Sequence, residues 1–158
     1  MTIWHQEPNL ERINTASENS MAGHLGIQFL EFGDDYLTAR MPVDERTVQP
    51  WGNLHGGASA AFAETLGSVG GNFTIDPEEA YVVGMEINVN HIRPIREGWV
   101  FGTARPFHVG RTTQVWEIKI TDQEERLISV SRLTLAVRPL PAEIDSPFLT
   151  GRSNPRST

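Results

Sequence analysis

The chain contains no cysteine among its 158 residues. This excludes disulfide bonds, thiolate metal sites and cysteine nucleophiles, and it is compatible with a reducing compartment. No window approaches the roughly eighteen consecutive apolar residues of a membrane span. Residues 1–8 also lack the basic start and apolar run of a signal peptide. We therefore expect a cytoplasmic protein with no membrane partner.

Basic residues are also scarce. There are 13 Lys and Arg against 20 Asp and Glu, so the formal net charge is −7. This balance argues against nucleic acid or an anionic membrane as a partner. The basic residues nevertheless gather between Arg93 and Arg111, which leaves room for a small anionic ligand. The length and the 39% of hydrophobic residues predict one folded domain, placed at residues 1–138.

The alternation of apolar and polar residues predicts the secondary structure. A short helix is expected over residues 9–20, with Asn9 as its cap. Strands are expected at residues 27–32, 37–43, 83–89, 99–107, 116–121 and 127–137. The last segment, residues 139–158, is rich in Pro, Ser, Arg and Thr and is predicted to be a mobile tail.

The most unusual segment runs from Gly56 to Gly71, where eleven of sixteen residues are Gly, Ala or Ser. A glycine-rich loop is the alternative, but the four alanines favour a helix. Small side chains let a helix approach its neighbours closely, so we expect a sheet to wrap around it. The order of two strands, one helix and four strands then predicts an α+β fold, in which one antiparallel sheet curls around a long central helix.

Glu64 is the only charged residue between His55 and Asp76. A carboxylate on a solvent-facing stripe is the ordinary interpretation, because charged residues are seldom buried. The helix has no polar face for Glu64 to belong to, however, and a lone buried acid is typical of a functional site. Ser68 follows at i+4 and is expected beside the carboxylate, either as a hydrogen-bond partner or as a small packing residue.

His55, Gly56 and Gly57 are placed where this helix begins. Free N–H groups at a helix start favour developing negative charge, such as that on a thioester oxygen under attack. A tight turn that needs glycine is the competing interpretation. Gln49, six residues before His55, could add a side-chain donor.

Other chemistries find little support in the sequence. There is no G-x-S-x-G elbow, no G-x-G-x-x-G motif and no P-loop. The five histidines show no metal-ligand spacing. We therefore predict neither a metal nor a cofactor.

Basic side chains end several predicted strands. His91 and Arg93 follow one strand, and His108, Gly110 and Arg111 join the next two. Solvated strand ends are the ordinary interpretation. Together, with Gly110 and the neighbouring N–H groups as an anion nest, they would also suit phosphate groups.

Several motifs give the chain a family resemblance. They are Gln49-Pro50-Trp51-Gly52-Asn53-Leu54-His55-Gly56-Gly57-Ala58-Ser59, Ala63-Glu64, Gly67-Ser68-Val69, Val83-Gly84-Met85-Glu86-Ile87-Asn88 and His108-Val109-Gly110. From about residue 21 to 137 the sequence resembles the hotdog-fold thioesterases that act on aromatic acyl-CoA. That group includes the 1,4-dihydroxy-2-naphthoyl-CoA thioesterases of menaquinone biosynthesis and thioesterases that clear misloaded aryl carrier protein.

The resemblance implies roles for individual residues. Glu64 would be the catalytic carboxylate, as nucleophile or as general base on water. Gly56 N–H and the Gln49 amide would hold the thioester oxygen, with His55 supporting the loop and Ser68 assisting at the carboxylate. Coenzyme A would contact Gly84, His91, Arg93, His108, Val109, Gly110, Arg111, Thr112 and Thr113. The active site would form between two subunits of a homotetramer, a dimer of dimers. The substrate would be an acyl-CoA or a carrier-protein thioester.

Two rival functions share this fold. One is a hydratase or dehydratase of enoyl or hydroxyacyl thioesters, which would place a catalytic histidine opposite an acid. Here His55 instead precedes the helix in an H-G-G context. The other is a non-catalytic acyl-CoA binding module, which usually carries a DNA-binding domain that this chain has no room for. The presence of Gln49, His55, Glu64 and Ser68 together argues against it.

Overall fold

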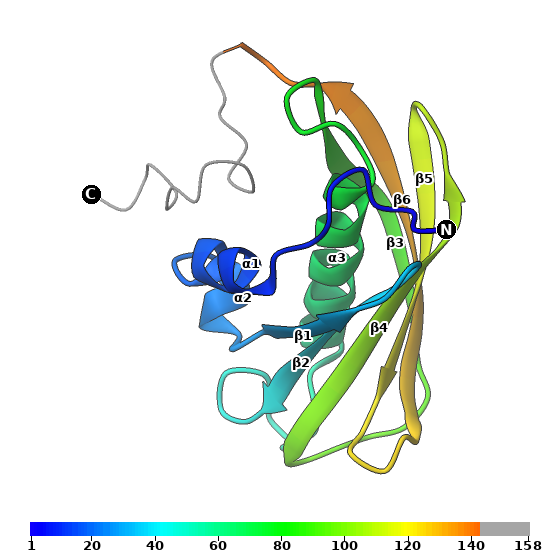
Figure 1. Cartoon of the computed structure of the whole chain (residues 1–158). Coiled ribbons are helices and arrows are strands. Elements are labelled where there is room, and N and C mark those ends of the chain that lie inside the picture. The colour runs from blue at the N-terminus through cyan, green and yellow to red at the C-terminus, as the bar shows by residue number, and fades with distance from the viewer. Residues whose placement is uncertain (143–158) are drawn as a thin grey trace.

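The fold is one antiparallel sheet of six strands wrapped around a central helix, as the sequence predicts (Figure 1). A computed structural model describes residues 1–142. The strands follow the order β1-β2-β4-β5-β6-β3 across the sheet. Their bounds are β1 Gln28–Phe32, β2 Leu37–Val43, β3 Ala80–His91, β4 Gly98–Val109, β5 Thr113–Thr121 and β6 Leu127–Pro139.

The central helix, α3 (Gly56–Phe73), confirms the helical interpretation of the small-residue segment. Its glycines lie where neighbours leave no room for a side chain. A Cβ on Gly67 would lie 2.5 Å from Leu133 Cδ2, and one on Gly70 would lie 3.0 Å from the Trp116 ring. The small residues therefore let α3 sit close to the inner face of the sheet, where most of the core is buried.

The helix predicted over residues 9–20 is shorter in the structure, and a second short helix that was not predicted follows it. Helix α1 spans Leu10–Ser17, and its first turn is capped by Asn9, whose side chain accepts from Arg12 N at 3.0 Å. Helix α2 spans Met21–His24. The two are separate because Ser20 adopts an extended conformation at the start of α2.

Strand β3 lies at one edge of the sheet and pairs only with β6. The pairing register shifts between Gly84 and Glu86, so Met85 is an extra residue in the strand. Met85 is 62% exposed, which is unusual for a large apolar side chain. The free edge of β3 therefore exposes a large apolar side chain and is open to pairing with another strand.

The described chain continues only a little beyond β6. Leu140 N donates to Glu79 O at 2.8 Å, which fastens the end of the sheet. Most of the predicted mobile tail, residues 143–158, lies outside the described residues. Among residues 1–142, no helix has both the length and the apolar composition that crossing a membrane requires.

Candidate active site

Glu64 lies near the middle of α3 and faces β3. Its carboxylate is partly buried and receives a hydrogen bond from Ser68 Oγ to Oε1 at 3.4 Å, one helical turn later. Burial raises the pKa of Glu64, and the hydrogen bond from Ser68 opposes this only in part. The predicted neighbour pair of Glu64 and Ser68 is therefore present, and the carboxylate is more basic than an exposed one.

Gly84 of β3 provides the surface that covers Glu64. A Cβ at position 84 would overlap Glu64 Oε1 and would lie 3.0 Å from Glu64 Cδ. The glycine thus allows the carboxylate to lie directly against the strand backbone. The sequence predicted Gly84 as a contact for coenzyme A, and the structure places it in contact with the candidate catalytic carboxylate.

The start of α3 offers a hydrogen-bond donor. His55 precedes the helix as its cap, and its Nδ1 accepts from Gly57 N at 2.7 Å. The N–H of Gly56 has no hydrogen-bond partner within residues 1–142. A Cβ on Gly56 would lie 2.7 Å from His91 Nε2, so His91 at the end of β3 packs over this turn. A free backbone donor at a helix start suits a developing oxyanion.

Gln49 is held in the loop that precedes α3. Gln49 N donates to Asn53 O and Gly52 N donates to Gln49 O, each at 2.8 Å. The turn requires a positive φ of 82° at Gly52. Gln49 Oε1 accepts from Trp51 N, which leaves the Gln49 Nε2 group free to donate to a ligand.

A cleft of about 280 Å³ opens at this end of the molecule. Of the predicted site residues it brings together Gln49, His91 and Arg93. The other lining residues were not predicted as site residues, although the first three belong to the motif from Gln49 to Ser59; they are Asn53, Leu54, Ser59, Ile92, Pro94 and Ile128. Glu64 does not line this cleft. It follows Gly56 by eight residues, or about 12 Å along the helix axis.

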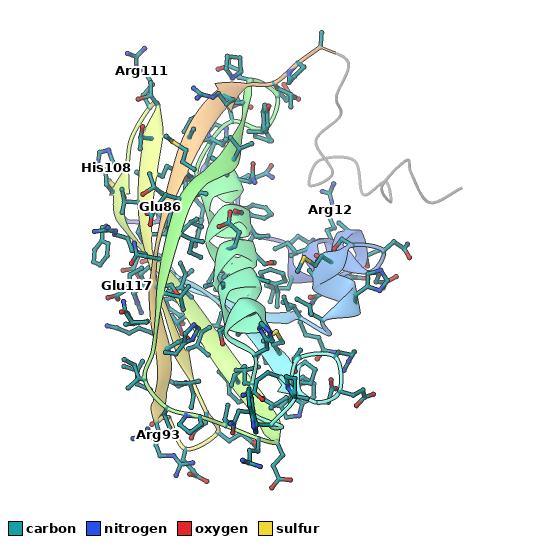
Figure 2. The ribbon with its side chains drawn as sticks, turned by 180° about the vertical axis from the view of Figure 1, so that it is seen from behind. Arg12, Glu86, Arg93, His108, Arg111 and Glu117 are labelled. Carbon is teal, nitrogen blue, oxygen red and sulfur yellow. The ribbon has the colours of Figure 1, made fainter. Side chains whose placement is uncertain are left out.

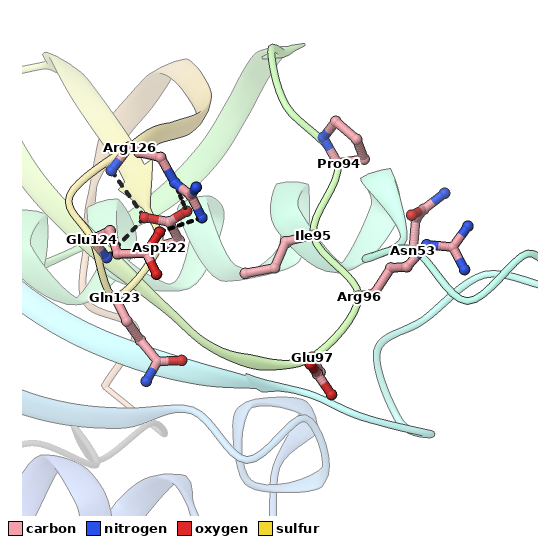
Figure 3. A pocket seen from close by; sticks show the side chains of 9 residues that line it. All are labelled: Asn53, Pro94, Ile95, Arg96, Glu97, Asp122, Gln123, Glu124 and Arg126. Carbon is pink, nitrogen blue, oxygen red and sulfur yellow. Dashed lines mark hydrogen bonds and ion pairs between the residues drawn. The ribbon is translucent and has the colours of Figure 1, made fainter.

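A second cleft, of about 530 Å³, shares Asn53 and Pro94 with the first (Figure 3). Arg126 is held there by the buried carboxylate of Asp122, with Arg126 Nε donating to Asp122 Oδ2 at 2.7 Å. Arg96 also lines this cleft and makes no ion pair within residues 1–142. Arg96 therefore adds an available positive charge near Arg93.

The basic residues that are close in sequence do not form one cluster in the subunit. Arg93 lies at one end of the sheet, and His108 and Arg111 lie toward the other (Figure 2). Through the strand register, Val109 is level with Gly84, seven residues from His91. That separation corresponds to roughly 23 Å. The turn from His108 to Thr113, closed by Gly110 N donating to Thr113 O at 3.0 Å, is therefore far from the cleft at the helix start.

Asn72 is a residue whose role the sequence did not suggest. It lies two helical turns after Glu64 on the same side of α3, and its side chain accepts from Val82 N at 3.1 Å. The sequence could have placed Asn72 beside Ser68 and Glu64, because positions 64, 68 and 72 repeat at the i+4 spacing of one helix face.

Comparison with known proteins shows what class of protein combines these features. The model of the thioesterase superfamily matches residues 52–129. The chain is 50% identical over 135 residues to the 1,4-dihydroxy-2-naphthoyl-CoA hydrolase of Escherichia coli strain K12, covering 85% of this chain and 98% of that protein. It is 49% identical over 135 residues to the proofreading thioesterase EntH of Cronobacter turicensis, with the same coverage. A crystal structure of a mutant of thioesterase PA1618 from Pseudomonas aeruginosa superposes with a TM-score of 0.87 and 47% identity, over 88% of this chain and all of that one.

The chain therefore belongs to the thioesterase superfamily and has the hotdog fold. It is an enzyme of the thioester hydrolase class. These comparisons confirm the predicted family, fold and enzyme class.

Proposed function

We propose that this enzyme hydrolyses aromatic acyl-CoA thioesters, such as 1,4-dihydroxy-2-naphthoyl-CoA or hydroxybenzoyl-CoA, with Glu64 as its catalytic carboxylate. One observation carries the role of Glu64: it is the only ionisable residue of α3, and burial against Gly84 raises its pKa. The aromatic substrate is supported by the names of the Escherichia coli and Cronobacter relatives.

In the proposed reaction, Gly56 N–H and Gln49 Nε2 donate to the thioester carbonyl oxygen. The Glu64 carboxylate either attacks the carbonyl carbon or takes a proton from an attacking water. In the first route the carbon–sulfur bond breaks to leave an acyl–Glu64 anhydride, which water then hydrolyses to the free acid and the regenerated carboxylate. In the second route the activated water adds to the carbonyl carbon and the carbon–sulfur bond breaks directly. In both routes the departing thiolate of coenzyme A takes up a proton that comes from the water. Ser68 orients the carboxylate through its hydrogen bond.

The proposed oxyanion donors and the proposed catalytic carboxylate must come from two different subunits. A carbonyl whose oxygen is held at Gly56 is too far from Glu64 of the same chain, because about 12 Å of helix separates the two residues. A second subunit must bring its own Gly56 and Gln49 to Glu64. The proposed homodimer, and the homotetramer built from it, would then be necessary for catalysis.

The free edge of β3 suggests how the subunits meet. Val82 N–H is already bonded to Asn72, which leaves residues 83–91 of this edge available. If two such edges pair antiparallel about a two-fold axis at Ile87, Gly84 of one subunit lies level with Asn90 and His91 of the partner subunit. Because Gly84 covers Glu64 and His91 covers Gly56, this pairing brings the carboxylate to the oxyanion donors.

The same arrangement accounts for the separated basic residues. The two-fold axis at Ile87 that relates the two antiparallel β3 edges would move Arg93 of the partner subunit toward the turn containing His108 and Arg111. The phosphates of one coenzyme A could then meet both groups, which lie at opposite ends of a single subunit. A carrier-protein thioester would present a phosphate on the same pantetheine arm.

A hydrolysis screen tests the proposal. Benzoyl, hydroxybenzoyl, naphthoyl, phenylacetyl and aliphatic CoA thioesters are incubated with the enzyme, and thiol release is followed. Aromatic thioesters should give the highest kcat/KM, and Glu64→Gln should lower the turnover of all of them by about a thousandfold. A preference for aliphatic thioesters would refute the substrate class. Hydration of an added enoyl-CoA without thiol release would instead favour the hydratase alternative.

A further inference from the structure

Three polar side chains repeat along the face of α3 that meets β3. Glu64, Ser68 and Asn72 follow one another at four-residue intervals. Ser68 Oγ donates to Glu64 Oε1, and Asn72 Nδ2 donates to Ser68 O at 2.9 Å. The proposed function uses the first two residues of this row and leaves Asn72 without a role.

Asn72 connects the helix to the edge strand. Its Oδ1 accepts from Val82 N at 3.1 Å. The opposite residue on β6, Val137, directs its own N–H to Thr112 O, away from β3. Val82 and Val137 therefore form a pair without mutual hydrogen bonds, so the Val82 N–H points to the free edge of the sheet. Asn72 satisfies an edge donor that the sheet itself cannot satisfy.

The position of this hydrogen bond matters because β3 has a neighbouring strand on one side only. Within residues 1–142, the bond from Val82 to Asn72 is the one side-chain hydrogen bond that joins α3 to β3. Gly84 follows Val82 by two residues on the same inner face, and the irregularity at Met85 comes directly after it. Without Asn72, hydrogen bonds to β6 alone would hold the segment that covers Glu64.

We propose that Asn72 is a positioning residue for the thioesterase reaction, which holds β3 against α3 so that Gly84 keeps the Glu64 carboxylate covered and correctly placed. This inference rests on the proposed catalytic role of Glu64. Asn72 itself does not touch the substrate in this arrangement, and it acts through the strand.

Few ionisable groups could obscure the effect on Glu64. On β3, Glu86 points to the outer face of the sheet and His91 lies against Gly56, two helical turns from Glu64 (Figure 2). The inward-facing positions of the other strands that pack on α3 carry no ionisable side chain. These positions are Leu37, Ala39, Met41 and Val43 of β2, Val100, Gly102 and Ala104 of β4, Gln114, Trp116, Ile118 and Ile120 of β5, and Ser129, Ser131, Leu133 and Leu135 of β6. Within one subunit, a change in the titration of Glu64 would therefore report its burial. The proposed pairing also brings His91 of the partner subunit near the carboxylate, but that group is the same in the wild type and in the Asn72 variants.

The test compares two substitutions of Asn72 in the full-length enzyme. Asn72→Leu removes both hydrogen bonds and keeps the number and branching of side-chain heavy atoms. We expect kcat to fall about tenfold with KM changed less than twofold, because small misplacements of a catalytic group are costly. Asn72→Asp keeps an acceptor for Val82 N–H and should recover most of kcat. Thr65→Ala is the matched control, since it removes a side-chain bond to the i−4 carbonyl of the same helix and no hydrogen bond to β3. It should keep wild-type kcat.

Two further readouts separate positioning from general loss of structure. Hydrogen exchange of the Val82 amide should accelerate at least tenfold in Asn72→Leu, while the amides of α3 keep their protection. The acidic limb of kcat/KM should move to lower pH in the same variant, because the carboxylate becomes better hydrated. These measurements remain informative if Asn72→Leu loses some stability.

The possible outcomes are distinct. Wild-type enzyme without thioesterase activity would refute the proposed function. Active wild-type enzyme with wild-type kcat in Asn72→Leu, or equal losses in Asn72→Leu and Thr65→Ala, would overturn only the role of Asn72. A loss of kcat with an unmoved acidic limb and an unchanged Val82 exchange rate would also overturn it.

Discussion

The backbone of Gly84 lies directly against the carboxylate of Glu64, in the space that any other residue would fill with its Cβ. This contact joins the edge strand of the sheet to the middle of the central helix. It also removes water from one side of the only ionisable group on that helix, which raises the pKa of Glu64. The contact therefore links a packing requirement of the fold to the proposed chemistry.

Substituting this glycine should separate fold from function. In Gly84→Ala the new methyl group overlaps Glu64 Oε1, which is the end of a flexible side chain and can move aside. We expect kcat to fall by about 10- to 100-fold while the melting temperature changes by only a few degrees. Thiol release and thermal unfolding measure the two effects. Val83→Ala, next to it on the same strand, is the control and should keep most of the activity.

Glu64→Gln should lower kcat by about a thousandfold, because the proposed nucleophile or base is lost. The variant should nevertheless be at least as stable as the wild type at neutral pH. Because folding raises the pKa of Glu64, the native state favours the protonated form, and stability from this group is lost as pH rises through the folded pKa. A neutral amide avoids that loss. The stability difference should shrink in acid, where the carboxyl group is protonated. Turnover within tenfold of the wild type would contradict the assignment.

The pH dependence of hydrolysis follows from the same pKa. The reaction requires the ionised carboxylate, so kcat/KM should fall as pH drops through the raised pKa of Glu64. The hydrogen bond from Ser68 lowers this pKa. Ser68→Ala should therefore raise it further and move the acidic limb to higher pH. An acidic limb that moves to lower pH in Ser68→Ala would show that the hydroxyl does not stabilise the ionised form.

The central part of this architecture could be predicted from the sequence. Eleven small residues between Gly56 and Gly71 indicated a helix enclosed by a sheet, and i+4 spacing indicated the contact of Ser68 with Glu64. The first prediction uses the composition and the second the periodicity of one element, and both are local properties of the sequence. The alternation of apolar residues likewise located all six strands, although the structure extends most of them.

Contacts between elements were harder to predict. The sequence placed Gly84 and Arg93 on or near one strand but gave no register against α3, so the contact of Gly84 with Glu64 was not foreseen. Arg93 and Arg111 are separated by eighteen positions, yet β4 runs between them and carries Arg111 to the far end of the sheet. Proximity in sequence therefore suggested a single basic cluster that one subunit does not form.

Oligomerisation can be tested at the edge strand. The wild-type enzyme should have a mass of at least twice the 17.6 kDa of one chain by light scattering at micromolar concentration, and four times that mass if dimers pair. Met85→Lys places a charge on the apolar edge of β3, where Met85 is 62% exposed in the single chain. This change should weaken the dimer and lower activity together. A fully active monomer would contradict the two-subunit site.

The final prediction concerns the far end of the ligand. Arg93 and Arg111 are the predicted phosphate contacts, and exposed charge pairs of this kind contribute on the order of one kcal/mol each. Arg93→Ala and Arg111→Ala should each raise KM for an acyl-CoA several-fold with little change in kcat, since the ground and transition states share this binding. Neither change should affect a truncated thioester that lacks the nucleotide. Arg132→Ala, which removes an exposed charge from the outer face of β6, is the control.

The comparison of the two arginines carries more information than either variant alone. Because they lie at opposite ends of one subunit, a single coenzyme A can meet both only if two subunits contribute to its site. Equal increases in KM for Arg93→Ala and Arg111→Ala would therefore support antiparallel pairing of the β3 edges. An increase for Arg93→Ala alone would place the nucleotide beside the cleft at the helix start. If both variants weaken the truncated and the complete thioester alike, these arginines do not bind coenzyme A and are solvated strand ends.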